Sequence, residues 1–548
     1  MDSLILELEW EKDNMTKELN IDLIPQEKFE FANTGDKIRD QKFEDKPIGY
    51  FRDAWNRFCK NKASIAAAII IICIILFAVI VPFFNASGSG TNLDSHYMKM
   101  TPRNLFLSKF GIATGCKTED FRDTSLIHNI GIGIASKDNV EDIPSIGGAL
   151  VEDNDLQPVK SVNDAYFVQQ GKNQTLFYDA TVDKYLQIGF IYDFVEQEEY
   201  ARIRAWEEET GIKVLYPLIE ENDQNFGYAT SGVSDPNWWY KTNKKGQPVR
   251  LNKSGSYTTI KYSNISEVTL EENYKRNADG SLKYWEYTGG GDFETAMYKV
   301  RVLYYNYYRY HHEGREPQFI FGTDSVGYDL AYRLAVGIRL SLILAVCIFF
   351  INFVLGAMYG AVEGYYGGST DLIMEFISYV LSGVPFIVVS TLFQMHLASK
   401  VGPIPSLLFA FVVTGWIGTA SLVRTQFYRF KNQEYVMAAR TLGARDRRII
   451  WKHIFPNTLG TIITSSVLAI PGVIFSESML SYLGIVNLGG TKTTSLGTLL
   501  SDASTIWTSV PHLMLFPAVV ISLLMICFNL FGNGLRDAFN PSLRGVEE

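Results

Sequence analysis

Six apolar stretches, separated by polar and charged segments, dominate the hydrophobic pattern of this 548-residue chain. The first reads ASIAAAIIIICIILFAVIVPFF at residues 63–84 and contains no charged residue. A helix of about 20 apolar residues crosses the hydrocarbon core of a bilayer, so this stretch predicts a membrane span. The others predict spans at residues 334–360, 372–397, 404–424, 458–484 and 512–532. The pattern therefore predicts an α-helical polytopic membrane protein with six transmembrane helices.

Basic residues near the ends of the spans predict the orientation, because lysine and arginine are retained on the cytoplasmic side. The tail at 1–62 carries four of them just before the first span, and the tail at 533–548 carries two. We therefore expect both tails in the cytoplasm. The first span follows a charged tail and is longer than the apolar part of a signal peptide, so we expect it to be retained. The basic residues are Arg52, Arg57, Lys60, Lys62, Arg536 and Arg544.

A polar insertion, residues 85–320, separates the first two spans and is expected on the extracytoplasmic side. It is long enough to bury a hydrophobic core of its own. Glu199–Thr210 has the composition of a short acidic helix that Gly211 would end, and Ile212–Ile219 would follow as a strand. Alternation of side chains predicts another strand at Lys299–Tyr308. The insertion is therefore expected to be an α+β domain.

A basic segment, Glu434–Pro456, lies between the fourth and fifth spans, within a connection at residues 425–457. Its excess of positive charge predicts a cytoplasmic loop. The segment contains five basic residues against two acidic ones. The basic residues are Arg440, Arg445, Arg447, Arg448 and Lys452, and the acidic residues are Glu434 and Asp446.

A short helix with a small-residue face is expected at the start of this loop. Asn432 is a suitable N-cap, and Glu434 stands in the first turn, where the helix dipole favours a negative charge. Helical spacing places Tyr435, Ala439 and Leu442 on one face, with Ala438 beside them. Gly443 can end the helix in a left-handed conformation. Such a helix is suited to dock in a groove of a soluble partner.

The order of small residues in this loop resembles the "EAA" loop of ABC-importer permeases. Ala438 and Ala439 are followed by Gly443 and, thirteen positions later, by Pro456, although Met437 stands where many members have Glu. The ending HIFPN at 453–457 is similar to that of the peptide-importing branch.

Two other segments point to the same family. FGTDSVGYDL at 321–330 resembles the entry to the second span of the oligopeptide/dipeptide permease C subunits, although Tyr328 replaces their usual Arg. The last span and tail, PHLMLFPAVVISLLMICFNLFGNGLRDAFNP, are similar to theirs. The resemblance covers roughly residues 50–84 and 318–544 and leaves the insertion unexplained.

The resemblance implies a type I ABC importer-like fold in a bacterial plasma membrane, with a permease core at residues 321–532. It implies a second permease subunit in a heterodimer, two ABC ATPase subunits, an extracytoplasmic solute-binding protein and a peptide substrate. It assigns the short helix as the coupling helix that contacts an ATPase subunit. The implied coupling residues are Glu434, Tyr435, Ala438, Ala439, Leu442, Gly443 and Pro456.

Three residues within the predicted spans are candidates for the pathway or its gate. Glu477 is a carboxylate in the fifth span, and intramembrane carboxylates are functional candidates by default. The alternative is that it lies near the outer end of the span and reaches water. Pro385 and Pro471 can kink their helices, which suits a gate, although proline is common in membrane helices without such a role.

Catalytic chemistry is not expected in this chain. The glycine-rich segment Gly489–Thr494 lacks the Gly-Lys-Ser/Thr order of a phosphate-binding loop. The net charge of −9 argues against a nucleic-acid partner, and no cofactor or metal is expected. Cys116 is the only cysteine of the insertion, so that domain cannot form an internal disulfide.

Two other classes remain as alternatives. A membrane-anchored receptor or sensor would explain the large insertion but not the cytoplasmic loop. A secondary transporter is disfavoured by the few charged residues within the spans.

Overall fold

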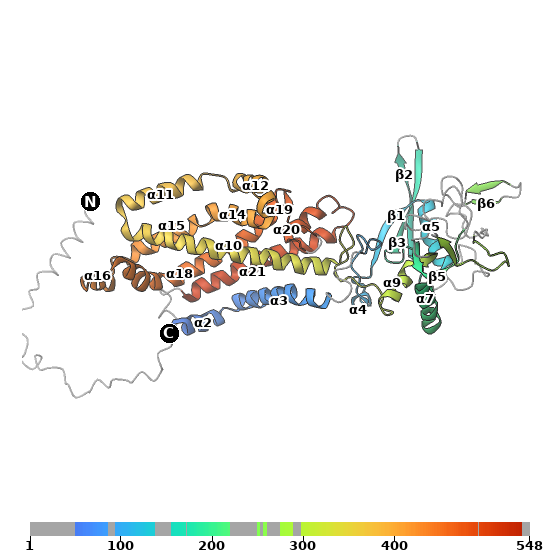
Figure 1. Ribbon diagram of the computed structural model, residues 1–548, viewed down its shortest axis with the longest axis horizontal. Coiled ribbons are helices and arrows are strands. Elements are labelled where there is room, and N and C mark those ends of the chain that lie inside the picture. The colour runs from blue at the N-terminus through green and yellow to red at the C-terminus, as the bar shows by residue number, and fades with distance from the viewer. Residues whose placement is uncertain are drawn as a thin grey trace, which may run out of the picture. The chain divides into compact units, whose positions relative to one another are not determined.

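A computed structural model describes residues 50–85, 94–136, 155–170, 173–219, 249–251, 256–259, 274–288, 297–490 and 493–539 (Figure 1). The chain divides into two compact units, residues 1–57 and 58–548. Of the first unit, the structure describes only the part of helix α2 (Tyr50–Lys60) that ends at residue 57. The second unit contains all the elements that follow.

Five helical segments within the described residues are long and apolar enough to cross a membrane. A sixth candidate is a broken pair, α11 (Gly368–Ser382) and α12 (Phe386–His396), whose axes differ by 73°. If this pair forms one span, the number of spans equals the predicted six. The five unbroken segments are Lys62–Phe83, Leu330–Tyr366, Pro403–Phe430, Asp446–Tyr482 and His512–Phe539.

Several spans are assembled from consecutive helices. The helices of the membrane part are α3 (Lys62–Asn85), α10 (Leu330–Tyr366), α13 (Ala398–Val401), α14 (Pro403–Gly415), α15 (Ile417–Phe430), α18 (Phe455–Val467), α19 (Ala469–Tyr482), α20 (Leu496–Ala503) and α21 (His512–Phe539). The last helix continues seven residues beyond the predicted end of its span at 532, so the tail expected from 533 begins as helix.

The longest helix contact joins α10 to α15, and glycines make it close. Gly356, Gly360 and Gly364 recur every four residues along α10. A Cβ atom at Gly356 would lie 2.6 Å from the Cβ of Thr419, and one at Gly360 would collide with the carbonyl oxygen of Ala420. Small residues at this spacing let two helix backbones approach each other in a membrane.

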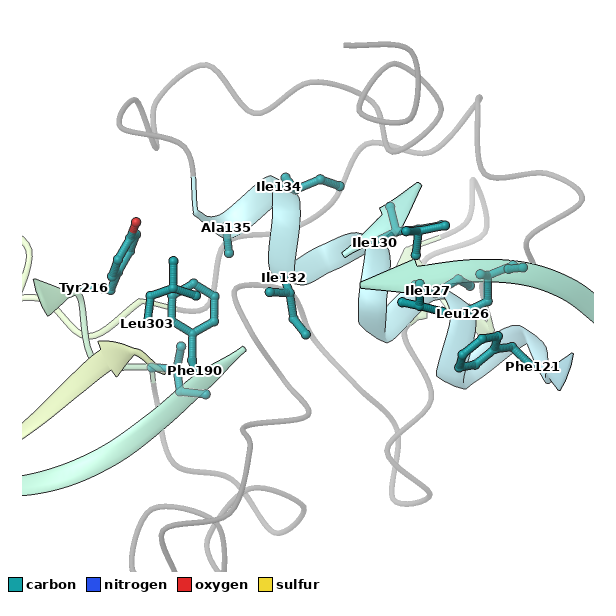
Figure 2. Close-up of a cluster of buried hydrophobic side chains, with 14 of the residues drawn as sticks. Phe121, Leu126, Ile127, Ile130, Ile132, Ile134, Ala135, Phe190, Tyr216 and Leu303 are labelled. Atoms are coloured by element: carbon teal, nitrogen blue, oxygen red, sulfur yellow. The ribbon is translucent and has the colours of Figure 1, made fainter. Parts of the chain in front are cut away.

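The described part of the insertion contains two larger antiparallel sheets and one two-stranded pair, and its hydrophobic cores are separate from those of the spans. In the first sheet the strand order is β1 (Cys116–Phe121), β3 (Asn173–Asp183), β2 (Val159–Gln170). Helix α5 (Asp123–Ala135) packs its isoleucines on this sheet, as Figure 2 shows for Ile127 and Ile130.

The second sheet is centred on β9. Strands β4, β5 and β8 all pair with β9 antiparallel, while β6 and β7 form a separate pair. The strands are β4 (Phe190–Glu196), β5 (Leu215–Tyr216), β6 (Val249–Leu251), β7 (Tyr257–Thr259), β8 (Trp285–Thr288) and β9 (Met297–Leu303). The other helices of the insertion are α4 (Leu105–Ser108), which precedes β1, α7 (Gln197–Thr210), which lies between β4 and β5, and α9 (Tyr304–His311), which follows β9.

One expected helix of the insertion is confirmed and two expected strands are shorter than predicted. Helix α7 ends at Gly211, which is left-handed with φ 71°. The strand expected at Ile212–Ile219 is reduced to β5. The strand expected at Lys299–Tyr308 ends at Leu303, and α9 follows.

The error at α9 has a physical reason. Tyr97 contacts Tyr304 and Tyr308, with ring centroids 4.9 and 5.3 Å away. These two tyrosines are four residues apart, the spacing that places side chains on one face of a helix. Burial against Tyr97 therefore favours the helix over the strand that aromatic residues usually prefer.

Candidate functional site

The predicted coupling helix is present as α16 (Glu434–Thr441), but it begins differently from the prediction. Its N-cap is Gln433, with no side-chain capping bond, because Asn432 belongs to the turn that follows α15. Asn432 is therefore not the N-cap. Glu434 lies in the first turn, as expected.

The end of α16 matches the prediction. Gly443 has φ +80°. Its amide donates to the carbonyl of Arg440 at 3.0 Å, and the amide of Ala444 donates to that of Ala439 at 3.0 Å. These two bonds define a Schellman motif, which requires a left-handed residue where glycine has no steric penalty.

The two faces of α16 have different environments. Val436 is fully buried in a cluster with Phe427 and Ile450. Leu442 is 88% exposed, Tyr435 and Ala438 are exposed, and Ala439 is half-buried. The face predicted to dock is thus uncovered in this chain. Val436, which anchors the opposite face, was not identified from the sequence, although its aliphatic side chain in a short, mostly exposed helix is a usable signal.

Polar contacts connect this loop to the end of α10. The Tyr365 hydroxyl donates to Oδ1 of Asp446 at 2.6 Å. Nη2 of Arg440 donates to the same hydroxyl at 3.5 Å. Tyr365 is one residue from the end of α10. These contacts therefore join Arg440 of α16 and Asp446 to the end of α10.

Pro456 occupies the second position of α18, directly after a π-helical segment, η4 (Ile449–Ile454). A short helix, α17 (Asp446–Arg448), precedes that segment. Proline is tolerated at the start of a helix because its missing N–H would have no intrahelical partner there. The π-helical segment thus lies between α17 and the regular helix α18.

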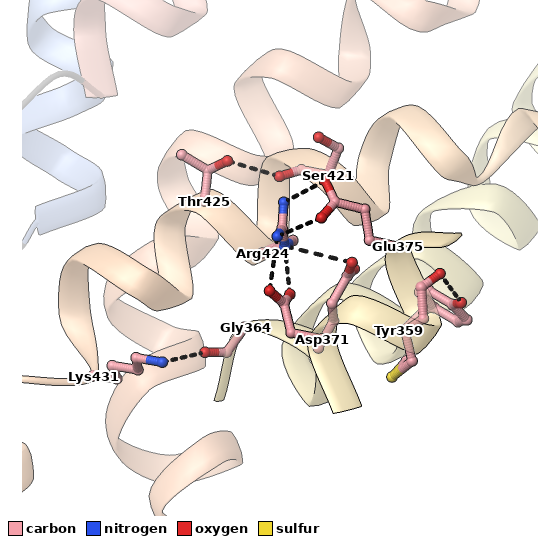
Figure 3. Close-up of polar contacts among 10 residues, drawn as sticks. Tyr359, Gly364, Asp371, Glu375, Ser421, Arg424, Thr425 and Lys431 are labelled. Carbon is pink, nitrogen blue, oxygen red and sulfur yellow. Dashed lines mark hydrogen bonds and ion pairs between the residues drawn. The ribbon is translucent and has the colours of Figure 1, made fainter. Parts of the chain in front are cut away.

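An unpredicted charge cluster joins three spans near the same end of α10 (Figure 3). Arg424 of α15 binds Asp371 of α11 through two nitrogens, with its Nε 2.6 Å from Oδ1 and its Nη2 2.8 Å from Oδ2. The same guanidinium binds Glu375 at 2.9 and 3.0 Å. Its Nε also lies 3.4 Å from Oε1 of Glu363 in α10.

The cluster has three carboxylates and one guanidinium, a formal charge of −2. Lys431 lies nearby, and its Nζ donates to the carbonyl of Gly364 at 3.0 Å. The connection at residues 361–371 contains no Lys or Arg that would indicate its side of the membrane. Asp371 and Glu375 are four residues apart, and this spacing places two carboxylates on one helix face, which was a usable signal for a charged site. Their partner, Arg424, lies on another span, so residue spacing could not identify it.

The two prolines proposed for a gate lie at helix junctions. Pro385 is the N-cap residue of α12, at the break where the third span bends by 73°. Pro471 is buried at the third position of α19, shortly after the junction with α18 at Leu468. Pro385 therefore coincides with a real kink, whereas α18 and α19 belong to one continuous span.

Glu477 is buried, which excludes the interpretation that it simply reaches water. Only 1% of the surface of Glu477 is exposed. Oε2 accepts from Ser341 of α10 at 3.0 Å, and Oε1 accepts from Ser481 at 3.1 Å. The carboxyl group thus links the second and fifth spans. It belongs to a different set of contacts from the coupling residues around α16 and Tyr365.

Comparisons with known proteins address the class of this molecule. Residues 352–545 match the family described as binding-protein-dependent transport system inner membrane component. Residues 49–102 match the N-terminal transmembrane domain of oligopeptide transport permease C. With its apolar spans, the chain is therefore a multi-pass inner-membrane permease component.

Relatives define the branch. The oligopeptide transport system permease protein OppC of Bacillus subtilis is 40% identical over 225 residues, which cover 41% of this chain and 72% of OppC. The dipeptide transport system permease protein DppC of the same organism is 42% identical over 230 residues, covering 41% and 69%. OppC of Escherichia coli is 38% identical over 234 residues, covering 42% and 74%. The chain belongs to the OppC/DppC family of ABC-importer permease subunits.

Solved structures add a distant likeness. The inward-facing MetNI methionine ABC transporter aligns with a TM-score of 0.32 and 15% identity, over 38% of this chain and 97% of that chain. An amino acid ABC transporter crystallised with histidines aligns with a TM-score of 0.30 and 14% identity, over 37% and 92%.

Membership of the permease family does not favour the receptor alternative.

Proposed function

We propose that this chain is a permease subunit of an ATP-driven importer of oligopeptides or dipeptides. The relatives' names support the peptide substrate. In this proposal a second permease completes the pathway, two ATPase subunits bind below and a solute-binding protein delivers peptide. The tails face the cytoplasm and the α+β insertion lies outside. The ATPases supply the hydrolysis, and this chain supplies no catalytic group.

The main support for the coupling assignment is the two-sided environment of α16. Its inner face is fixed by Val436, while Leu442 projects outward with 88% of its surface exposed. An exposed apolar side chain beside small residues is typical of a surface that a partner covers. Tyr435, Ala438, Ala439 and Gly443 would lie in the contact, Glu434 would support the first turn, and Pro456 would fix the following span.

The side-chain contacts around Tyr365 and Arg424 suggest a route for the movement. ATP binding would close the ATPase pair and shift α16. The contact between Arg440 of α16 and Tyr365, together with the bond between Tyr365 and Asp446 of α17, would transmit the shift to α10. Glu363 and Arg424 then connect α10 with α15 and α11. Pro385, Pro471 and Glu477 would lie further along the pathway, at the bends and contacts where the spans change their opening.

The substitution Ala439→Arg tests this proposal. A long charged side chain would have to be buried in the ATPase contact without a partner, which costs several kcal/mol after relaxation. We expect normal membrane insertion with joint loss of ATPase association and of peptide uptake, by about tenfold or more. Association is measured by co-purification, and uptake with a labelled peptide.

The matched control is Gln433→Arg. Gln433 is exposed and precedes the first helical residue, so the same side chain there remains in water. We expect nearly normal association and uptake. Full transport by the Ala439→Arg variant would exclude the docking assignment.

A further inference from the structure

A cavity of ≈ 980 Å³ lies between the base of the insertion and the start of α21. Its wall comes from four parts of the chain: residues 98–119, 184–188, 320–321 and 509–516. This volume is within the range of small-molecule sites, about 300–1,000 Å³. The proposed transport function assigns no role to it.

Most of the wall is apolar. Met100, Leu107 and Ile188 contribute from the insertion, Phe321 from the segment before α10, and Phe516 from α21. The rings of Phe321 and Phe516 are in contact, with centroids 4.5 Å apart. A ligand with a hydrocarbon portion would therefore find a continuous apolar surface.

Charged side chains occupy another part of the wall. Lys99, Lys117, Lys184 and Glu119 line the cavity and give it a formal charge of +2. Nζ of Lys117 lies 2.7 Å from Oε1 of Glu119, and Nζ of Lys184 lies 3.0 Å from Oε2. Lys117 also donates to the carbonyl of Ser509 at 2.7 Å, next to the sixth span. One carboxylate is thus shared by two ammonium groups, which leaves positive charge for an anion.

The surroundings of the cavity are unusually apolar for a surface. Met98, Ile112 and Ile320 line it and are exposed, and Phe106 and Phe110 beside it are 68% and 70% exposed. These side chains stand next to the first residues of α21, a candidate membrane span. Exposed apolar groups at the end of a span are suited to the boundary between headgroups and acyl chains.

We propose that this cavity binds one anionic phospholipid from the leaflet in which α21 begins. Its acyl chain would lie against Leu107, Ile188 and Phe516. Its phosphate would lie beside Lys117 and Lys184. The combination of an apolar wall, a net positive charge and a position at a span end fits this amphiphile.

The test uses the full chain in lipid nanodiscs. Photo-crosslinkable phosphatidylglycerol or phosphatidylcholine with identical acyl chains is added at equal mole fraction, and labelled peptides are identified by mass spectrometry. We expect phosphatidylglycerol to label residues 98–119 and 509–516 in preference, by about fivefold for each lysine that contacts it, since one basic residue contributes about 1 kcal/mol. Equal labelling by the two lipids would overturn the proposal.

Charge variants give effects of opposite sign. Glu119→Gln raises the formal charge to +3 and should increase the preference for phosphatidylglycerol. Combining it with Lys117→Gln and Lys184→Gln leaves only Lys99, lowers the formal charge to +1, and should strongly reduce the preference without leaving an unpaired carboxylate. Lys109→Gln is the matched control, because Lys109 is exposed on the same segment but does not line the cavity.

A second variant keeps the test independent of the charged residues. Ile188→Trp would fill the apolar part of the cavity and should reduce labelling by both lipids at 98–119. An unchanged preference in the triple variant, or unchanged labelling in Ile188→Trp, would contradict the proposal. Displacement of the crosslink by a short peptide would assign the cavity to peptide instead. None of these results depends on ATPase docking, which Ala439→Arg tests separately.

Discussion

Arg424 of α15 lies among three carboxylates, of which Glu363 belongs to α10 and Asp371 and Glu375 belong to α11. It is only partly exposed, and its partner Glu363 is 3% exposed, so water screens this contact less than a surface ion pair. Glu375 is more exposed and its contact contributes less. The guanidinium is suited to this role because its planar nitrogens bind two carboxylates at once, which a lysine ammonium cannot do.

Replacing Arg424 by glutamine should weaken the junction of α10, α11 and α15. Removal of one partner leaves a buried charge without compensation, which costs roughly 3–5 kcal/mol for a fully buried pair and less at partial exposure. We expect a lower midpoint of thermal unfolding for the purified protein. Arg429→Gln, at an exposed position of the same helix, is the control and should change little. Equal midpoints for the two variants would show that the cluster does not stabilise the junction.

At the residue scale, the sequence predicted side chains whose role depends on local spacing. The left-handed Gly443 follows from chemistry within a few residues. The prediction that Asn432 is the N-cap was wrong. At Asn432 the chain is still in the turn that follows α15, and the residue before the first helical position of α16 is Gln433. The burial of Glu477 between serines of two helices could not be predicted, because it depends on which spans pack together.

Glycine spacing determines the closest helix pair. The stripe Gly356, Gly360, Gly364 was present in the sequence but does not identify its partner. The structure shows that α15 covers it, so that the carbonyl oxygen of Ala420 occupies the space where a side chain at Gly360 would begin. Close backbone contact of this kind resists any added atom, because the neighbour is main chain and cannot change rotamer.

The substitution Gly360→Ala should therefore destabilise the protein, although alanine is the better helix former. Overpacking costs about 1–3 kcal/mol, more than the roughly 1 kcal/mol that alanine gains in helix propensity. Gly418→Ala is the matched control, since Gly418 lies on α15 and a Cβ there meets nothing within 4 Å. We expect a lowered thermal midpoint for Gly360→Ala and an equal or raised one for Gly418→Ala. The reverse order would exclude tight packing at Gly360.

Helices and strands could be predicted where the residues of a single continuous segment determine the secondary structure. Hydropathy placed the spans, because a run of apolar residues has few alternatives in a bilayer. It could not show that the third span is broken before Phe386. The helix at Tyr304–His311 was predicted as part of a strand because alternating valines and tyrosines favour a strand. The contact with Tyr97, which is distant in sequence, favours the helix and could not be predicted from the segment itself.

For the whole molecule, the sequence predicted a membrane part and an inserted polar part, and the structure shows separate cores in each. The cores of the insertion surround Tyr216 and Val302, and those of the spans surround Ala345 and Val423. Strands β4 and β9 are more than a hundred residues apart. Their pairing could not be predicted from the sequence, because strand register depends on long-range contacts. Membrane orientation rests on the distribution of basic residues alone.

Cysteine labelling tests this orientation. In intact cells a membrane-impermeant maleimide should modify Cys116 in the insertion, whereas Cys59, which is exposed beside the first span, should react only after permeabilisation. Partial burial, followed by the charge of Asp183, raises the pKa of the Cys116 thiol, so its reaction should be slow at pH 7 and faster as rising pH increases the thiolate fraction. Cys116→Ser should abolish external labelling. Modification of Cys59 from outside would reverse the orientation and place the predicted coupling helix on the wrong side for an ATPase.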